Sequence, residues 1–126
     1  MKALSITEPY ASLICEGKKH IETRSWKTNY RGPLLIHASA TRIPHDYKHL
    51  VPMVRETRQG NIICKANLVD CVEMTREWIS SISKEEWFLG LYSVGRYAWI
   101  LEDIEPIEPI PAKGKLGLWE YKEAME

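Results

Sequence analysis

Residues 61–74, NIICKANLVDCVEM, form the longest stretch of the chain with the pattern of a single β-strand. Apolar residues recur at every second position, which is the spacing that places side chains on one face of a strand. By this period the shared face holds Ile62, Cys64, Ala66, Leu68, Asp70 and Val72. Such a strand is half-buried, so we expect the fold to be built around a sheet.

Shorter patterns on either side extend this sheet and add helices. Further strands are expected at Lys2–Ile6, His20–Ser25, 34–40 and 94–107. The turn-rich segment 109–121 is expected to end in a final short strand. Helices are expected after Pro9 as far as Gly17, over 44–58 with a break near Pro52, and after Ser83. Several strands with two or three short helices between them predict an α+β fold, a β-barrel of about five to six strands decorated with short helices.

Bulk composition narrows the function. The 126 residues predict a single domain, 1–126, and 17 basic residues balance 17 acidic ones. A protein that holds nucleic acid by charge alone is strongly basic, so any such role here must depend on a local patch. Three cysteines without C-x-x-C spacing predict small core residues in a reducing compartment. With no apolar leader and no membrane-length run, the sequence favours a cytoplasmic protein with no membrane contact.

A cluster of opposite charges lies within residues 16–26, EGKKHIETRSW. Glu22 and Arg24 share one face of a predicted strand, and Lys19 lies in the turn before it. An ammonium and a guanidinium around a carboxylate can hold a phosphate or the edge of a base. The alternative is an ion pair at the surface, which contributes little.

Aromatic and basic residues follow this cluster. Trp26, Lys27, Tyr30 and Arg31 alternate stacking groups with cations, a pattern of single-stranded nucleic-acid grooves and also of half-buried loops. In the next strand, the face that holds Leu34, Ile36 and Ala38 lies opposite the face that holds Leu35, His37 and Ser39. His37 and Ser39 are candidates to line the same cleft, although a strand histidine is more often structural. The other tryptophans are expected in the core or at the barrel ends: Trp78, Trp87, Trp99 and Trp119.

Asp70 is the one carboxylate on the apolar face of the long strand. Pointing inward, it would need a cation, and Lys19 or Arg24 is the natural partner. The alternative is that Asp70 lies past a bulge at the strand end and is solvated. His45 and His49 have the spacing of metal ligands, but only Asp46 lies near them, so no metal site and no cofactor are predicted.

The N-terminal third resembles the ASCH domain family. The shared features are S-I-x-x-P-Y-A-S-L-I from Ser5, G-x-K-x-x-E-x-R from Gly17 to Arg24, the pair Ser25–Trp26, and Y-R-G-P-L-L-I-H-A from Tyr30. The segments ANLVDCVEMT and P-I-P-x-K-G-x-x-G-L-W further on are also similar. The resemblance implies a PUA-like barrel with a cleft between the barrel and the first helix. It implies binding of RNA or a nucleotide there, with DNA as an alternative, and it places Lys19, Glu22 and Arg24 in the cleft, beside Tyr10, Ser25 and Trp26.

Some members of the family hydrolyse N4-acetylcytidine with a Lys, a Thr and a Glu, and others are ribonucleases. Lys19 matches the Lys, but Glu22 occupies the position of the Thr, with Thr23 beside it. Asp70 or Glu73 would supply the remaining carboxylate. A hydrolase with Lys19, Glu22 and Asp70 as its catalytic residues is therefore the alternative to a binding module.

Overall fold

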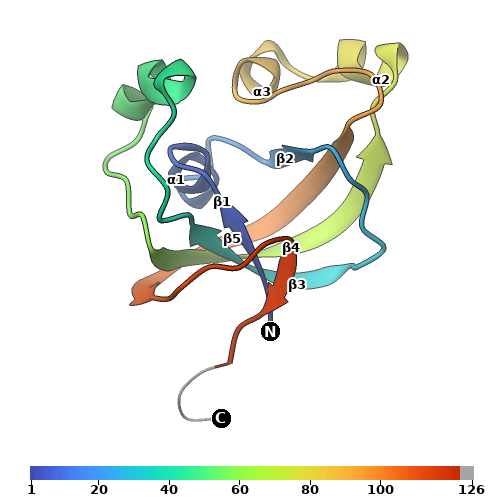
Figure 1. Cartoon of the computed structure of the whole chain (residues 1–126). Coiled ribbons are helices and arrows are strands. Elements are labelled where there is room, and N and C mark those ends of the chain that lie inside the picture. The colour runs from blue at the N-terminus through green and yellow to red at the C-terminus, as the bar shows by residue number, and fades with distance from the viewer. Residues whose placement is uncertain (123–126) are drawn as a thin grey trace.

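A computed structural model describes residues 1–122 as a curled, six-stranded half-barrel carrying short helices (Figure 1). The strand order is β2-β5-β4-β3-β1-β6, and only the β1–β3 pair is parallel among the described strands. The strands are β1 (Lys2–Ile6), β2 (Ile21–Arg24), β3 (Gly32–Ala38), β4 (Asn61–Glu73), β5 (Tyr97–Pro111) and β6 (Leu118–Glu120). The predicted α+β class and strand number are confirmed.

Strand alternation divides the interior into layers. On β3, Leu34, Ile36 and Ala38 face the main core together with Leu4, Ile6 and Trp99, whereas Leu35 faces a second cluster with Trp119. This is the division that the sequence predicted for residues 34–38. Since the main core also receives Ala11 and Ile14, it is the layer that fixes the first helix against the sheet.

The long strands β4 and β5 are irregular, and this changes which face their residues occupy. Their pairing shifts between Ile62 and Cys64, between Lys65 and Asn67, and between Leu68 and Asp70. Ile63 and Cys64 are consequently both buried, and Asp70 is turned to solvent. A β-bulge adds a residue and breaks the period of two. The single face predicted from Ile62 to Val72 therefore holds only from Cys64 to Leu68, because Ile62 packs in the second cluster and Asp70 is exposed.

The helices are short. They are α1 (Tyr10–Cys15), the 3₁₀ helix η1 (His45–Met53), α2 (Arg76–Ser81) and α3 (Lys84–Phe88). Ser83 caps α3 as predicted, accepting a hydrogen bond from the backbone N–H of Glu86. Helix α2, which is capped by Thr75, was not predicted from the sequence, and the helix predicted over 44–58 is longer than η1.

Two further expectations concern exposure. Trp99 and Trp119 are buried as predicted, but Trp87 is 56% exposed on α3, so its assignment to the core was wrong. Within residues 1–122, no helix has the length and apolar character needed to cross a membrane.

Candidate ligand-binding site

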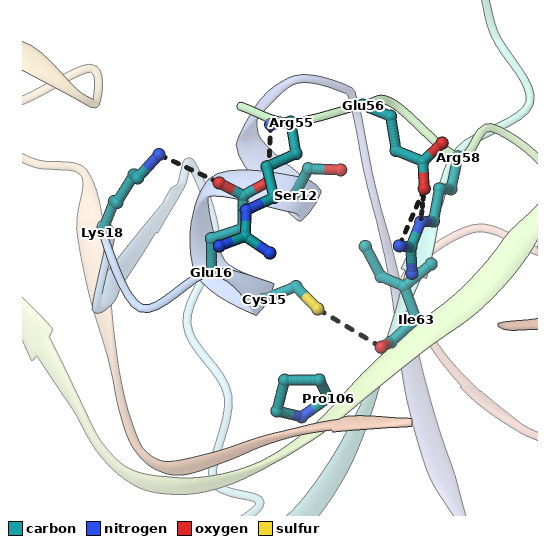
Figure 2. Close-up of a pocket in the computed structure, with 9 residues that line it drawn as sticks. All are labelled: Ser12, Cys15, Glu16, Lys18, Arg55, Glu56, Arg58, Ile63 and Pro106. Atoms are coloured by element: carbon teal, nitrogen blue, oxygen red, sulfur yellow. Dashed lines mark hydrogen bonds and ion pairs between the residues drawn. The ribbon is translucent and has the colours of Figure 1, made fainter. Parts of the chain in front are cut away.

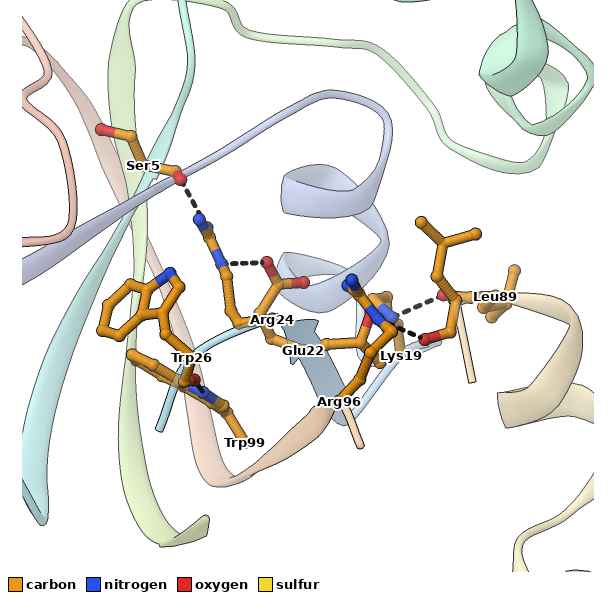
Figure 3. Close-up of polar contacts among 10 residues, drawn as sticks. Ser5, Lys19, Glu22, Arg24, Trp26, Leu89, Arg96 and Trp99 are labelled. Carbon is orange, nitrogen blue, oxygen red and sulfur yellow. Dashed lines mark hydrogen bonds and ion pairs between the residues drawn. The ribbon is translucent and has the colours of Figure 1, made fainter. Parts of the chain in front are cut away.

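A hollow of about 270 Å³ opens beside β2 and the start of α1. Six of the residues predicted for a ligand site line it: Tyr10, Lys19, Glu22, Arg24, Ser25 and Trp26. The rest of the lining comes from Ile6, Thr7, Thr23, Tyr47, Gly90, Leu91 and Arg96. Figure 3 shows the charged side chains of β2 and its neighbours gathered in front of α1.

Lys19 lines this hollow and is only 1% exposed. Its Nζ donates a hydrogen bond to the carbonyl of Leu89 and lies 5.0 Å from the centre of the Tyr10 ring, a cation–π distance. Burial lowers the pKa of the ammonium, while the carboxylates of Glu22 and Glu86 oppose that shift. A buried Lys therefore supplies directed N–H donors to the hollow.

The segment after α3 encloses Lys19. Glu86 on α3 accepts hydrogen bonds from the backbone N–H of His20 at 2.7 Å and from its ring Nδ1 at 3.1 Å. This contact holds the turn before β2 against α3, so that Leu89 and Gly90 cover the ammonium. A Cβ at Gly90 would lie 3.2 Å from Nζ of Lys19 and 2.8 Å from the ring of Tyr92, which leaves room only for glycine.

Glu22 and Arg24 form the charged pair that the sequence placed on one face of β2. Nε of Arg24 donates to Oε2 of Glu22 at 2.9 Å, and Nη2 donates to the carbonyl of Ser5 at 2.7 Å (Figure 3). The side chain of Glu22 is 9% exposed and that of Arg24 is 23% exposed. The pair is thus partly desolvated, and the interpretation as a fully solvated surface pair does not hold.

Arg96 also lines the hollow, although it was not predicted from the sequence to lie there. Its Nε donates to the carbonyl of Leu91 at 3.1 Å, and its Nη2 lies 3.5 Å from Oγ1 of Thr23. Arg96 directly precedes β5, and the antiparallel pairing of Tyr97 with Arg24 brings it beside β2. Local sequence carries no signal of this, because the pairing joins positions more than 70 residues apart.

Two aromatic residues provide apolar walls. Trp26 is 36% exposed and makes an edge contact with the buried Trp99, with ring centres 4.8 Å apart. Nε1 of Trp99 also donates to the carbonyl of Trp26 at 3.3 Å, which fixes the backbone of this residue. Tyr10 packs against Tyr47, and desolvation raises the pKa of Tyr10 to about 12. Tyr10 therefore remains a neutral hydroxyl at physiological pH.

The structure does not bring Asp70 or Glu73 to this hollow. The side chain of Asp70 is 59% exposed and lies 3.6 Å from Arg31, and Glu73 is exposed at the end of β4. Asp70 thus lies past a bulge and is solvated, and the inward orientation beside Lys19 was wrong. No carboxylate other than Glu22 lines the hollow among residues 1–122.

Four other predicted ligand residues lie elsewhere. Arg31 pairs with Asp70, and the hydroxyl of Tyr30 donates to the carbonyl of Pro33. His37 is 1% exposed: its Nε2 donates to the carbonyl of Ala112 at 2.8 Å, and its Nδ1 contacts the Ser5 hydroxyl at 3.0 Å. Ser39 bonds to Thr41. His37 is therefore a structural residue, and none of the four belongs to the lining of the hollow.

No three His, Cys, Asp or Glu side chains gather closely enough to hold a metal ion in the part of the chain described, residues 1–122. His45 and His49 lie on η1 and are both exposed. The hollow instead offers three cations, Lys19, Arg24 and Arg96, around the carboxylate of Glu22. Such a set can bind an anionic or polar ligand and satisfy both its acceptors and a donor.

The chain is similar to known proteins over most of its length. The model of the ASCH domain matches residues 4–111. Activating signal cointegrator 1 from Homo sapiens and from Mus musculus are each 29% identical over 131 residues, which cover 92% of this chain. The chain spans only 21% of the length of these relatives.

Solved structures are similar in fold. The crystal structure of ASCH from Zymomonas mobilis aligns over 87% of this chain and 72% of its own, with a TM-score of 0.57 and 22% identity. A point mutant of the Zymomonas protein aligns with a TM-score of 0.56 and 23% identity, over 87% of this chain and 74% of its own. At this level of identity the likeness establishes the fold, and it supports the PUA-like architecture.

Proposed function

The chain belongs to the ASCH domain family, and from that premise we propose that the hollow around Lys19, Glu22 and Arg24 binds one nucleotide of single-stranded RNA. The observation that carries the proposal is a local excess of positive charge. Three cationic residues and one carboxylate line the hollow, in a chain whose formal net charge is zero. A neutral protein that concentrates positive charge in one concave site favours an anionic ligand there.

The remaining hydrogen-bonding capacity fits a nucleotide. Arg24 and Arg96 each use Nε and Nη2 within the protein, so Nη1 of each is left for phosphate or base oxygens. Oε2 of Glu22 accepts from Arg24, which leaves Oε1 to accept from an exocyclic amine or ring N–H. The site therefore offers donors for the anionic part of a nucleotide and an acceptor for its base.

The size and walls of the hollow limit the ligand to one unit. About 270 Å³ lies just below the usual range of small-molecule sites, about 300–1,000 Å³. Trp26, at the rim and 36% exposed, supplies a face on which a base can stack. We expect one nucleotide in the hollow and its neighbour on the strand near Trp26.

Titration of a short fluorescent single-stranded RNA tests the proposal. Replacing Arg24 or Arg96 by Ala should weaken binding about tenfold or more, since a hydrogen bond from a charged donor contributes about 1.5–3 kcal/mol. Lys122→Ala, at an exposed position outside the hollow, is the control and should leave the affinity unchanged. A urea unfolding curve for each variant separates loss of binding from loss of fold.

Equal affinity for the wild type, both arginine variants and the control would end the proposal. Single-stranded DNA of the same sequence and the free nucleotide serve as competitors. If the free nucleotide displaced the labelled RNA and single-stranded DNA did not, the ligand would be a small molecule.

The hydrolase alternative is favoured by one observation: Lys19 and Thr23 both line the hollow. Burial lowers the pKa of Lys19, as required of a lysine that acts as a base. The test is incubation with N4-acetylcytidine, with chromatographic detection of cytidine. Turnover that is lost in Lys19→Met would support catalysis, and the absence of turnover at high protein concentration would leave the binding function alone.

A further inference from the structure

A second cavity, of about 380 Å³, lies beside the C-terminal end of α1 and shares no lining residue with the ligand hollow (Figure 2). Cys15 lies in it, together with Arg55, Arg58 and the side chain of Ile63. Lys18, Arg55 and Glu56 in the lining are exposed, so the cavity is open to solvent. A half-buried thiol is thus accessible to a small solute.

A second thiol lies directly behind the first. The thiol of Cys15 donates to the carbonyl of Ile63 at 3.4 Å, and Cys15 packs against the buried cluster that includes Cys64, the next residue on β4. Cys64 is fully buried and does not line the cavity. The two cysteines are 49 positions apart in the sequence and are brought together by packing of α1 on β4.

The charges around Cys15 favour its thiolate. The hydrogen bond from Cys64 and the guanidinium of Arg58 lower the pKa of Cys15, and they outweigh burial and the carboxylates of Glu16 and Glu8. Burial and the neighbouring Cys15 strongly raise the pKa of Cys64. Of the two thiols, Cys15 is therefore the one that ionises more readily.

We propose that Cys15 is a site of oxidation by peroxide and that Cys64 resolves it as an intramolecular disulfide. The Cys15 thiolate attacks one oxygen of hydrogen peroxide, the S–O bond forms and the O–O bond breaks, giving Cys15 sulfenic acid and hydroxide. The sulfur of Cys64 then attacks the Cys15 sulfur and displaces its hydroxyl group. That group takes the Cys64 proton and leaves as water. In total, two thiols and one peroxide give one disulfide and two waters, and a thiol reductant reverses the change.

The consequence is a covalent link between the end of α1 and the middle of the sheet. Tyr10 at the other end of α1 lines the ligand hollow, and Lys19 follows the helix by four residues. Oxidation would fix α1 against β4 by a disulfide. In the reduced protein both cysteines are free, and no disulfide joins these two elements.

Intact-mass analysis after exposure to hydrogen peroxide tests the proposal. The wild type should lose two hydrogens, and digestion should give a linked peptide that joins Cys15 to Cys64. Cys71 is also free and half-buried but lies outside the cavity, so Cys71→Ser is the matched control and should behave as the wild type. Dithiothreitol should restore the original mass.

Two further variants separate the roles. In Cys64→Ser, Cys15 should stop at the sulfenic acid and be captured by dimedone. In Cys15→Ser, Cys64 should stay reduced. Alkylation after denaturation should show a loss of the Cys64 thiol at least about tenfold smaller than in the wild type. The proposal fails if Cys71 oxidises faster than Cys15, or if dimedone captures Cys15 in the wild type while Cys64 remains reduced.

Discussion

At the scale of single residues, the site depends on a lysine that has been removed from water. Lys19 is tolerated in the interior because Leu89, the Tyr10 ring and the nearby carboxylates replace its hydration. Its position also depends on a neighbour with no side chain, because Gly90 lies against both Nζ of Lys19 and the ring of Tyr92. Substitutions at such contacts should affect stability and binding together.

Gly90→Ala is the sharpest test of that contact. The added methyl group must displace Tyr92 or Lys19, so we expect a loss of about 1–3 kcal/mol in the free energy of unfolding, as for other overpacked sites. RNA affinity should fall with it. Gly60→Ala is the control for RNA affinity, because Gly60 lies outside the hollow. The φ of +83° at Gly60 makes this substitution strained, but the added Cβ would meet no atom within 4 Å. A variant Gly90→Ala that binds as the wild type would contradict the enclosed position of Lys19.

Tyr10 gives a prediction for alkaline pH. Desolvation raises its pKa from 10.0 to about 12, so above pH 10 the unfolded chain loses this proton while the folded protein keeps it. The unfolded state then binds fewer protons, and the free energy of unfolding must fall between about pH 10 and pH 12. Tyr10→Phe should make this fall shallower in urea titrations across that range. Parallel curves for the variant and the wild type would refute the assignment.

At the scale of elements, α1 is fixed by a carboxylate outside the helix. Glu8 is fully buried, and its Oε1 accepts from the backbone N–H of Ser12 at 2.8 Å. Its Oε2 accepts from the Ser12 hydroxyl at 2.6 Å and from the backbone N–H of Arg58 at 2.8 Å. One side chain thus joins the first turn of α1 to the segment before β4, and so helps to shape both cavities.

Glu8→Gln should weaken this junction. The amide can accept on one side only, so at least one buried donor loses its acceptor, and we expect a loss of about 2–3 kcal/mol in unfolding free energy. Amide hydrogen exchange at Arg58 should accelerate as well. Glu56→Gln is the control. It removes a carboxylate that is 63% exposed and pairs with Arg58, so it should change the free energy of unfolding by less than about 1 kcal/mol. Equal effects of the two substitutions would exclude the junction.

At the scale of the whole molecule, the distribution of charge matters more than its sum. The 17 basic and 17 acidic residues cancel, yet the ligand hollow contains three cations and one carboxylate. A protein arranged in this way should contact few phosphates, in contrast to one with an extended basic face.

The salt dependence of RNA binding tests this arrangement. If one or two phosphates contact the protein, the logarithm of the association constant should fall with the logarithm of the salt concentration with a slope between about −0.7 and −1.4. Each phosphate on a single strand contributes about −0.7 to this slope. Titrations at several potassium chloride concentrations measure it. A slope several times steeper would show that binding uses an extended surface, and it would remove the hollow as the main site.

Much of the fold follows from patterns that a short window of sequence contains. Alternation over residues 34–38 correctly predicted which side chains face the main core, and Ser83 correctly marked the start of α3. The convergence of Lys19, Glu22 and Arg24 was also predictable, because two of them share a face of one strand. The helix α2 was missed because its six residues carry little periodicity beyond the Thr75 cap.

By itself, the sequence determined the strands, the first helix and the charged cluster at its end, because these depend on neighbours within a few residues. Only the tertiary structure decided the exposure of each charge. Bulged pairing of β4 with β5 turned Asp70 to solvent, antiparallel pairing of β5 with β2 added Arg96, and the segment after α3 buried Lys19. Each of these outcomes depends on contacts between distant parts of the chain, which no local period encodes.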